Sequence, residues 1–216
     1  MAEIMKIKAI ISDLDGTLAD TEKLHIKAWN RVANEYGFRL DLGDSNYYKE
    51  LFGLRDLDFV KAYASKAGIK LDDEILKEIL LRKSYEYKKL TMNLSPAKCV
   101  TNLMDFIKIH NLNFAIVTSS MKIDAFAVLS KLNINYDVLI TSDDVNKVKP
   151  DQEPILKALN MLKVMPEETI GIGDTIYDRE SYKKAGLENI FILNCNNLNC
   201  FESICDVIDV IKKKYF

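Results

Sequence analysis

Five short stretches of the chain are almost continuously apolar and have the length of β-strands. They span residues 6–12, 113–118, 137–141, 169–173 and 189–193. A strand that is buried on both faces carries apolar side chains at successive positions, as the strands of parallel sheets do. The pattern therefore predicts a parallel sheet whose two faces are both covered.

Between the later strands, apolar residues recur at helical spacing. Such stripes lie within residues 100–107 and 155–162, and a third follows the last strand at 204–211. Amphipathic helices that alternate with buried strands are typical of a doubly wound α/β fold. We expect this architecture for most of the chain.

The alternation is interrupted over residues 20–90, which contain helical patterns but no convincing strand. Gly37 is placed to end the first helical stretch, and Asp72 is a suitable N-cap for the last. The sequence therefore predicts a core domain made of residues 1–19 and 91–216, with an α-helical domain at 20–90 inserted after the first strand.

Composition narrows the class of protein. Hydrophobic residues make up 48% of the 216 positions and charged residues 29%, as in ordinary globular proteins. A net charge of −2 gives no electrostatic reason for nucleic acid or an anionic membrane as partner. The first residues lack the cleavage pattern of a signal peptide. We expect a cytoplasmic monomer that acts on a small molecule.

The chain has four cysteines, at positions 99, 195, 200 and 205. The last three have neither a CxxC pair nor a neighbouring histidine, so their spacing does not indicate a zinc site. The cysteine content fits a reducing compartment, and we expect buried or half-buried thiols.

Polar residues with chemical potential follow the predicted strands. The first strand is followed by Asp13, Asp15 and Thr17, the second by Thr118, Ser119 and Ser120, the third at some distance by Lys147 and Lys149, and the fourth by Asp174 and Asp178. Ligands of open α/β sheets bind outside the carboxyl ends of the strands, where these residues would meet. Carboxylates, small hydroxyls and a lysine suit a phosphoryl group and a divalent cation such as Mg²⁺.

Each of these groups has a plausible role in phosphoryl transfer. Asp13 and Asp174 can supply carboxylates to the cation. Asp13 and Asp15 are two positions apart and face the same side, so one can attack phosphorus while the other serves as general acid and base. Thr118 and the following N–H groups can hold phosphate oxygens, and Lys149 can neutralise developing charge.

Four motifs in this order resemble those of the haloacid dehalogenase-like superfamily: DLDGT, the threonine after the second strand, the lysine of KP, and GDTxxD. The resemblance covers nearly the whole chain and implies a Rossmann-like core. It implies that Asp13 is the nucleophile and Asp15 the acid/base, and that Mg²⁺ is bound by Asp13, the backbone carbonyl of Asp15, Asp174 and the additional acid Asp178. The proline after position 149 favours Lys149 over Lys147, and Thr118 fills the second motif, with Thr17, Ser119 and Ser120 beside the phosphate.

The inserted helices resemble the small α-helical cap of this superfamily. ADTEKLHIKAWN and RKSYEYKKLTMNLSPAK are similar to stretches of β-phosphoglucomutase and related sugar-phosphate phosphatases. This likeness implies that His25 couples the cap to the acid/base aspartate and that Lys83 lies near the substrate. Arg55 stands about one position before the place of a cap arginine that binds substrate in the mutase.

Two departures favour hydrolysis over isomerisation. Met121 stands where the mutase has a lysine, and the pair Gly173–Asp174 has the usual phosphatase form. The sequence therefore predicts a magnesium-dependent phosphomonoesterase for a small phosphorylated metabolite such as a sugar phosphate. A hexose-phosphate mutase and a non-catalytic phosphometabolite-binding protein are the alternatives. His25 as a structural residue and Asp178 as a helix-terminal residue also stay open.

Overall fold

The computed structural model describes residues 6–36, 54–66, 68–194 and 200–216, and it contains one five-stranded parallel sheet with the strand order β3-β2-β1-β4-β5. The strands are β1 (Ala9–Ser12), β2 (Asn113–Val117), β3 (Val138–Ile140), β4 (Thr169–Gly173) and β5 (Asn189–Ile192). All five predicted strands are present, and the short β1 lies at the centre of the sheet.

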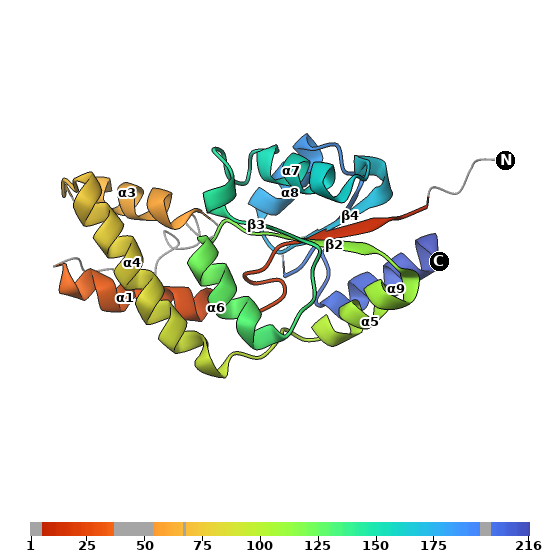
Figure 1. Ribbon diagram of the computed structural model, residues 1–216, viewed down its shortest axis with the longest axis horizontal. Helices are drawn as coiled ribbons and strands as arrows, with labels where there is room; N and C mark the ends of the chain where they lie inside the picture. The colour runs from red at the N-terminus through yellow and green to blue at the C-terminus, as the bar shows by residue number, and fades with distance from the viewer. Residues whose placement is uncertain (1–5, 37–53, 67, 195–199) are drawn as a thin grey trace.

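Helices cover both faces of the sheet (Figure 1). The helices α5 (Val100–His110), α6 (Lys122–Leu132) and α9 (Ile204–Tyr215) lie on one face, and α7 (Glu153–Leu162) and α8 (Ile176–Lys184) on the other. Alternate residues of β1 enter the two cores, because Ile10 packs with the first group and Ile11 with the second. Short 3-10 turns η2 (Ser142–Asp144) and η3 (Pro166–Glu168) lie before α7 and β4. The prediction of a doubly wound α/β fold is confirmed.

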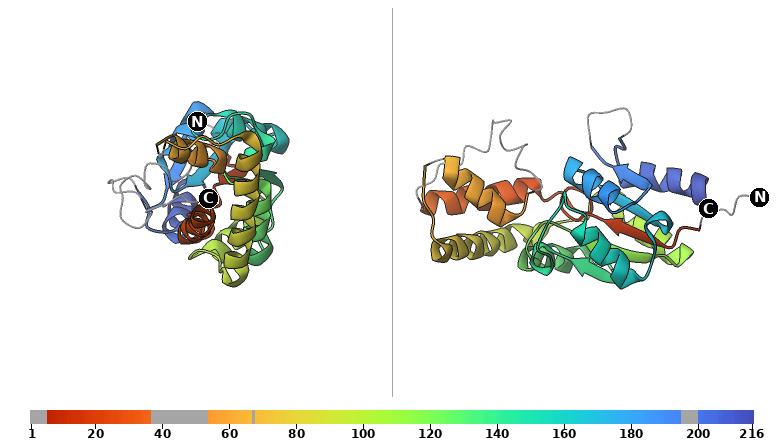
Figure 2. Two further views of the ribbon diagram at one scale, coloured as in Figure 1. Left: turned by 90° about the vertical axis from the view of Figure 1, so that its left-hand side faces the viewer. Right: turned by 90° about the horizontal axis from the view of Figure 1, so that it is seen from above.

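Three further helices form a separate group at the end of the molecule opposite α9 (Figures 1 and 2). They are α1 (Glu22–Glu35), α3 (Asp56–Lys66) and α4 (Asp73–Leu90), and α4 continues into the 3-10 turn η1 (Thr91–Asn93). This helical unit has its own apolar cluster, which includes Trp29, Val32, Phe59 and Ile79. Asp72 begins α4 as expected, because its Oδ1 accepts the Ile75 N–H at 2.8 Å. Gly37 lies outside the described residues.

The cysteines differ from the expectation. Cys99, at the start of α5, forms a disulfide with Cys205 of α9, although 106 residues separate them. The two helices lie side by side on one face of the sheet, which brings the sulfur atoms together (Figure 1). Cys200 is also disulfide-bonded, so the prediction of free thiols is wrong at Cys99, Cys200 and Cys205, and Cys195 lies outside the described residues. No helix in the described part of the chain is long and apolar enough to cross a membrane.

Candidate active site

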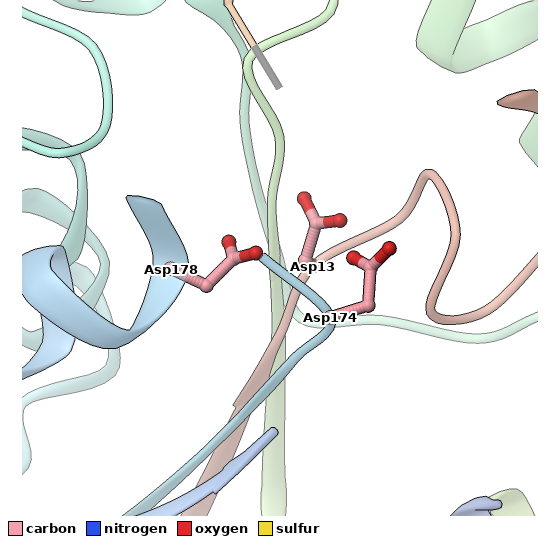
Figure 3. A group of neighbouring side chains, drawn as sticks. All are labelled: Asp13, Asp174 and Asp178. Carbon is pink, nitrogen blue, oxygen red and sulfur yellow. The ribbon is translucent and has the colours of Figure 1, made fainter. Parts of the chain in front are cut away.

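The central strands deliver two carboxylates to one place. β1 pairs with β4 in the register Ser12 to Ile172, so the chain leaves both strands at the same level. Asp13 follows β1, and Asp174 follows β4. Asp178 reaches the same place from the first turn of α8, and ligand oxygens of these three residues, here called the acidic trio, lie within 4.8 Å of one another. Figure 3 shows the three carboxylates pointing into a shared space.

The glycine of DLDGT makes this approach possible. Gly16 has φ +81°, and a Cβ atom there would lie 2.1 Å from Oδ2 of Asp174. A side chain at this position would occupy the place of the carboxylate. The next residue, Thr17, donates its hydroxyl to Oδ1 of Asp174 at 3.1 Å. The motif therefore positions Asp174 as well as carrying Asp13 and Asp15.

Lys149 lies against the acidic trio. Its Nζ is 2.6 Å from Oδ1 of Asp13 and 2.6 Å from Oδ1 of Asp178, and it also donates to the carbonyl of Val117 at 3.1 Å. The lysine is only 4% exposed. Lys147, the alternative, has a side chain that is 73% exposed. The structure thus brings Lys149, and not Lys147, to Asp13.

One lysine does not neutralise three carboxylates, of which Asp13 and Asp178 are buried and Asp174 is half-buried. Burial is the main cause that raises the pKa of Asp13 to about 8, and Asp178 and Asp15 add to it while Lys149 opposes it. Burial, followed by repulsion from Asp13 and Asp178, raises the pKa of Asp174 well above its usual value. A divalent cation would relieve this repulsion. The donor set of the acidic trio therefore fits Mg²⁺.

Asp178 combines two functions that the sequence presented as alternatives. It closes a capping box at the start of α8, where its Oδ2 accepts the Thr175 N–H at 3.0 Å. Its other oxygen is the partner of Lys149. A helix-terminal role thus fixes a carboxylate of the site.

Asp15 lies beside the trio and is surrounded by donors. Its Oδ2 accepts from Ser120 at 2.7 Å and from Thr118 at 3.0 Å. Its Oδ1 lies 2.7 Å from the Thr21 hydroxyl and 3.2 Å from His25 Nε2. Burial alone would raise the pKa of Asp15, but the hydrogen bond and charge of His25, with these hydroxyls, hold it well below its usual value. Asp15 is therefore in its base form.

Two contacts to Asp15, from the hydroxyls of Thr21 and Tyr87, were not foreseen from the sequence. The Tyr87 hydroxyl of α4 lies 3.3 Å from Oδ1, and the His25 ring stacks on Tyr87 with 4.1 Å between centroids. Thr21 stands inside the ADTEKLH stretch that drew attention to His25, so its position was a usable signal. Tyr87 lies inside the RKSYEYKKLTMNLSPAK stretch that drew attention to Lys83, but its spacing gave no sign of a contact with Asp15.

A pocket separates the strand ends from the helical unit. Its core side includes Asp13, Asp15, Ser119 and Lys149, and its opposite side is formed by residues of the helical unit. The Ser119 hydroxyl is buried and has no hydrogen-bond partner among the residues that the structure describes. An incoming phosphate oxygen would satisfy it.

Two of the expected substrate contacts lie elsewhere. Arg55 makes a two-pronged ion pair with Asp58, with distances of 3.0 and 3.1 Å. Lys83 is fully buried, with Nζ at 2.7 Å from both Asp56 and Asp124. Neither side chain is among the described residues that line the pocket.

Comparisons with known proteins agree with this arrangement. The chain is 30% identical over 191 residues to a phosphorylated carbohydrates phosphatase of Thermotoga maritima. The aligned residues cover 86% of this chain and 84% of that protein. It is also 30% identical over 192 residues to the pyrophosphatase PpaX of Bacillus mycoides, covering 87% and 84%. The resemblance to sugar-phosphate phosphatases is confirmed.

Solved structures share the fold. The β-phosphoglucomutase of Clostridium difficile superposes with a TM-score of 0.86 at 22% identity over 97% of each chain. CbbY of Rhodobacter sphaeroides, solved with phosphate, has a TM-score of 0.79 at 22% identity over 91% of this chain and 89% of that one. The sequence profile of the haloacid dehalogenase-like hydrolases matches residues 10–192. The chain therefore belongs to the haloacid dehalogenase-like hydrolase family and is a hydrolytic enzyme.

Proposed function

We propose that this enzyme is a magnesium-dependent phosphomonoesterase that acts on a sugar phosphate or a similar small metabolite through an aspartyl-phosphate intermediate. One observation carries the proposal: Asp13 and Asp15 line the same pocket as Lys149 and the Ser119 hydroxyl, which has no hydrogen-bond partner in the described part of the chain. The names of the two relatives add support, since one acts on phosphorylated carbohydrates and the other on pyrophosphate.

The acidic trio would hold the cation, and the resemblance to the family adds the backbone carbonyl of Asp15. When bound, the cation supplies positive charge that lets an anionic phosphate approach an anionic nucleophile. Lys149 supports the same approach, because its ammonium group already contacts the Asp13 carboxylate. Ser119 lies where its hydroxyl can hold a phosphate oxygen, and Ser120, which also lines the pocket, would have to release its hydrogen bond to Asp15 to do so.

The first chemical step forms a bond between an Asp13 oxygen and phosphorus and breaks the bond to the leaving oxygen. The leaving oxygen takes a proton from Asp15, which must therefore be protonated at this step. The approaching phosphate favours this, because a like charge raises the pKa of a carboxyl group. The alcohol product then departs.

The second step releases phosphate. A water oxygen attacks phosphorus, its proton passes to Asp15, and the bond to Asp13 breaks, which regenerates the free carboxylate. The base form of Asp15, which its neighbours favour, is the form that this step requires.

The test replaces the nucleophile with a group of equal size. Asp13→Asn should abolish hydrolysis of p-nitrophenyl phosphate in the presence of Mg²⁺. Its melting temperature without metal should not fall, because the change removes one of three mutually repelling carboxylates while Lys149 keeps its contact with Asp178. Asp209→Asn, an exposed aspartate of α9, is the matched control and should keep full turnover. Retained turnover in Asp13→Asn would exclude the proposal.

A further inference from the structure

The side of the pocket that faces the strand ends is formed by residues of the helical unit and the segment that leads into α3. Its described residues provide one carboxylate, that of Asp56, the imidazole of His25, and the apolar side chains of Trp29, Leu54 and Phe59. Trp29 and Phe59 pack against each other with 5.0 Å between ring centroids. A leaving group held by the phosphate site would extend toward this wall.

Asp56 is fixed in place by a buried ion-pair chain. Its Oδ2 accepts from Lys83 Nζ at 2.7 Å, and the same Nζ donates to Oδ2 of Asp124 at 2.7 Å. Asp124 belongs to α6 of the core, so the ion pairs of Lys83 connect the helical unit to the core. Lys83 is 0% exposed, and its ammonium group lies behind the carboxylate rather than in the pocket.

The two carboxylates of this ion-pair chain differ in how firmly they hold a negative charge. Burial, with repulsion from Asp56, raises the pKa of Asp124 despite the nearby Lys83, so the negative charge is held more firmly by Asp56. Burial would raise the pKa of Asp56, but the charges of Lys83 and His25, with hydrogen bonds to Lys83 and Asp124, together hold the pKa below its usual value. Asp56 is therefore ionised at neutral pH.

The described part of the wall offers no lysine or arginine for a second anionic group, and its one imidazole, that of His25, already contacts Asp15 at 3.2 Å. Lys149 is the one lysine among the described pocket residues, and it is paired with Asp13 and Asp178. The nearest arginine in sequence, Arg55, is paired with Asp58. A phosphate or carboxylate at the far end of the substrate would meet the Asp56 carboxylate instead.

We propose that Asp56 is a specificity-determining residue that selects monophosphates with an uncharged, hydroxyl-bearing leaving group. The carboxylate accepts hydrogen bonds from hydroxyls of the leaving group, and Trp29 and Phe59 cover its carbon skeleton. The same carboxylate repels a leaving group with a second phosphate. This inference rests on the proposed phosphatase function and specifies its substrate class.

The test compares the selectivity of the wild-type enzyme with that of Asp56→Asn, in the presence of Mg²⁺. The substrates are glucose 1-phosphate, fructose 1,6-bisphosphate and pyrophosphate, with p-nitrophenyl phosphate as the reference. The wild type should have a kcat/KM for glucose 1-phosphate at least about tenfold above that for either substrate with a second anion, as expected for one nearby charge of the same sign. In Asp56→Asn this ratio should fall by about tenfold, because the variant keeps the shape and removes the charge.

The control is Asp58→Asn, in the same helix, whose carboxylate pairs with Arg55 outside the pocket and whose loss should leave the ratio unchanged. A competition assay tests the same selectivity with the wild-type enzyme alone. Glucose 1-phosphate should inhibit its turnover of p-nitrophenyl phosphate more strongly than fructose 1,6-bisphosphate does. Equal inhibition, or a ratio that Asp56→Asn does not alter, overturns this inference. Absence of p-nitrophenyl phosphate turnover in the wild type would instead overturn the proposed phosphatase function.

Discussion

The Lys149 ammonium group lies 2.6 Å from Oδ1 of Asp13, although 136 positions separate the two residues. Both side chains are nearly buried, with exposed side-chain fractions of 5% and 6%. A buried carboxylate without a compensating charge is costly, so the pair has a structural consequence as well as a catalytic one. Removing the lysine would leave the acidic trio without the one cation that the described residues place against it.

Lys149→Met should therefore lower both stability and rate. Removing one member of a buried ion pair typically costs about 3–5 kcal/mol in the free energy of unfolding. The loss of charge stabilisation should lower kcat by about 100-fold or more. Urea unfolding without metal and steady-state kinetics with Mg²⁺ measure the two effects. Lys147→Met removes an exposed lysine two positions away and should change neither; a comparable loss there would contradict the assignment of Lys149.

Magnesium should stabilise the protein through the acidic trio. A ligand that binds the native state at 100 times its dissociation constant adds about 2.7 kcal/mol of stability. Millimolar Mg²⁺ should raise the melting temperature, and EDTA should reverse the increase. Asp174→Asn should remove most of the increase, because it removes a carboxylate from the trio. If the variant responded to Mg²⁺ as the wild type does, the metal would bind elsewhere.

Gly16→Ala should damage the site through Asp174. The new methyl group would need the space of the Asp174 carboxylate at a backbone conformation with φ +81°. We expect a loss of about 2 kcal/mol or more in unfolding free energy, with loss of Mg²⁺-dependent turnover. Gly68→Ala is the matched control, since Gly68 has φ +70° but no atom within 4 Å of the added Cβ. Gly68→Ala should lower the unfolding free energy by only about 1 kcal/mol, the cost of a left-handed backbone conformation at alanine, and should keep the activity.

His25→Gln should reveal how strongly His25 stabilises ionised Asp15. Because the native pKa of Asp15 is lowered, its stabilising effect is complete above the ordinary pKa of about 3.9 and is lost as the pH falls through the native value. The variant should be less stable by about 1–2 kcal/mol at pH 5, and by less at pH 2, where the pH approaches the native pKa of Asp15. Urea unfolding at both pH values measures this. An equal difference at the two would mean that stacking on Tyr87, and not charge, is what His25 contributes.

The parts of the site that could be predicted are those that follow from sheet topology. Parallel strands end at one edge, so Asp13, Thr118 and Asp174 had to lie near one another whatever the helices did. The strand pattern also made the core architecture evident, because each strand is apolar and short. Lys149 was harder, and the adjoining proline distinguished it from Lys147 only through family resemblance.

The parts that could not be predicted depend on how the helical unit packs. Tyr87 reaches Asp15 across 72 positions, and no local spacing encodes that contact. Adjacent residues near the start of a helix point in directions about 100° apart, so Arg55 turns to Asp58 while Asp56 lines the pocket. Lys83 is a polar residue by composition, but the packing of α4 against α6 buries it completely.

The disulfide between Cys99 and Cys205 connects the start of α5 to α9, far along the chain. A cross-link over 106 residues restricts the unfolded chain strongly, and disulfides of native proteins typically contribute about 2–4 kcal/mol. Cys205→Ser should therefore lower the unfolding free energy by about this amount under oxidising conditions. In dithiothreitol the wild type should become as unstable as the variant, because the bond is then absent from both. A difference that persisted after reduction would come from packing of the Cys205 side chain. The cross-link joins helices on the face of the sheet opposite α7 and α8, and α8 carries Asp178 of the acidic trio. We therefore expect p-nitrophenyl phosphate turnover at 25 °C to survive loss of the cross-link.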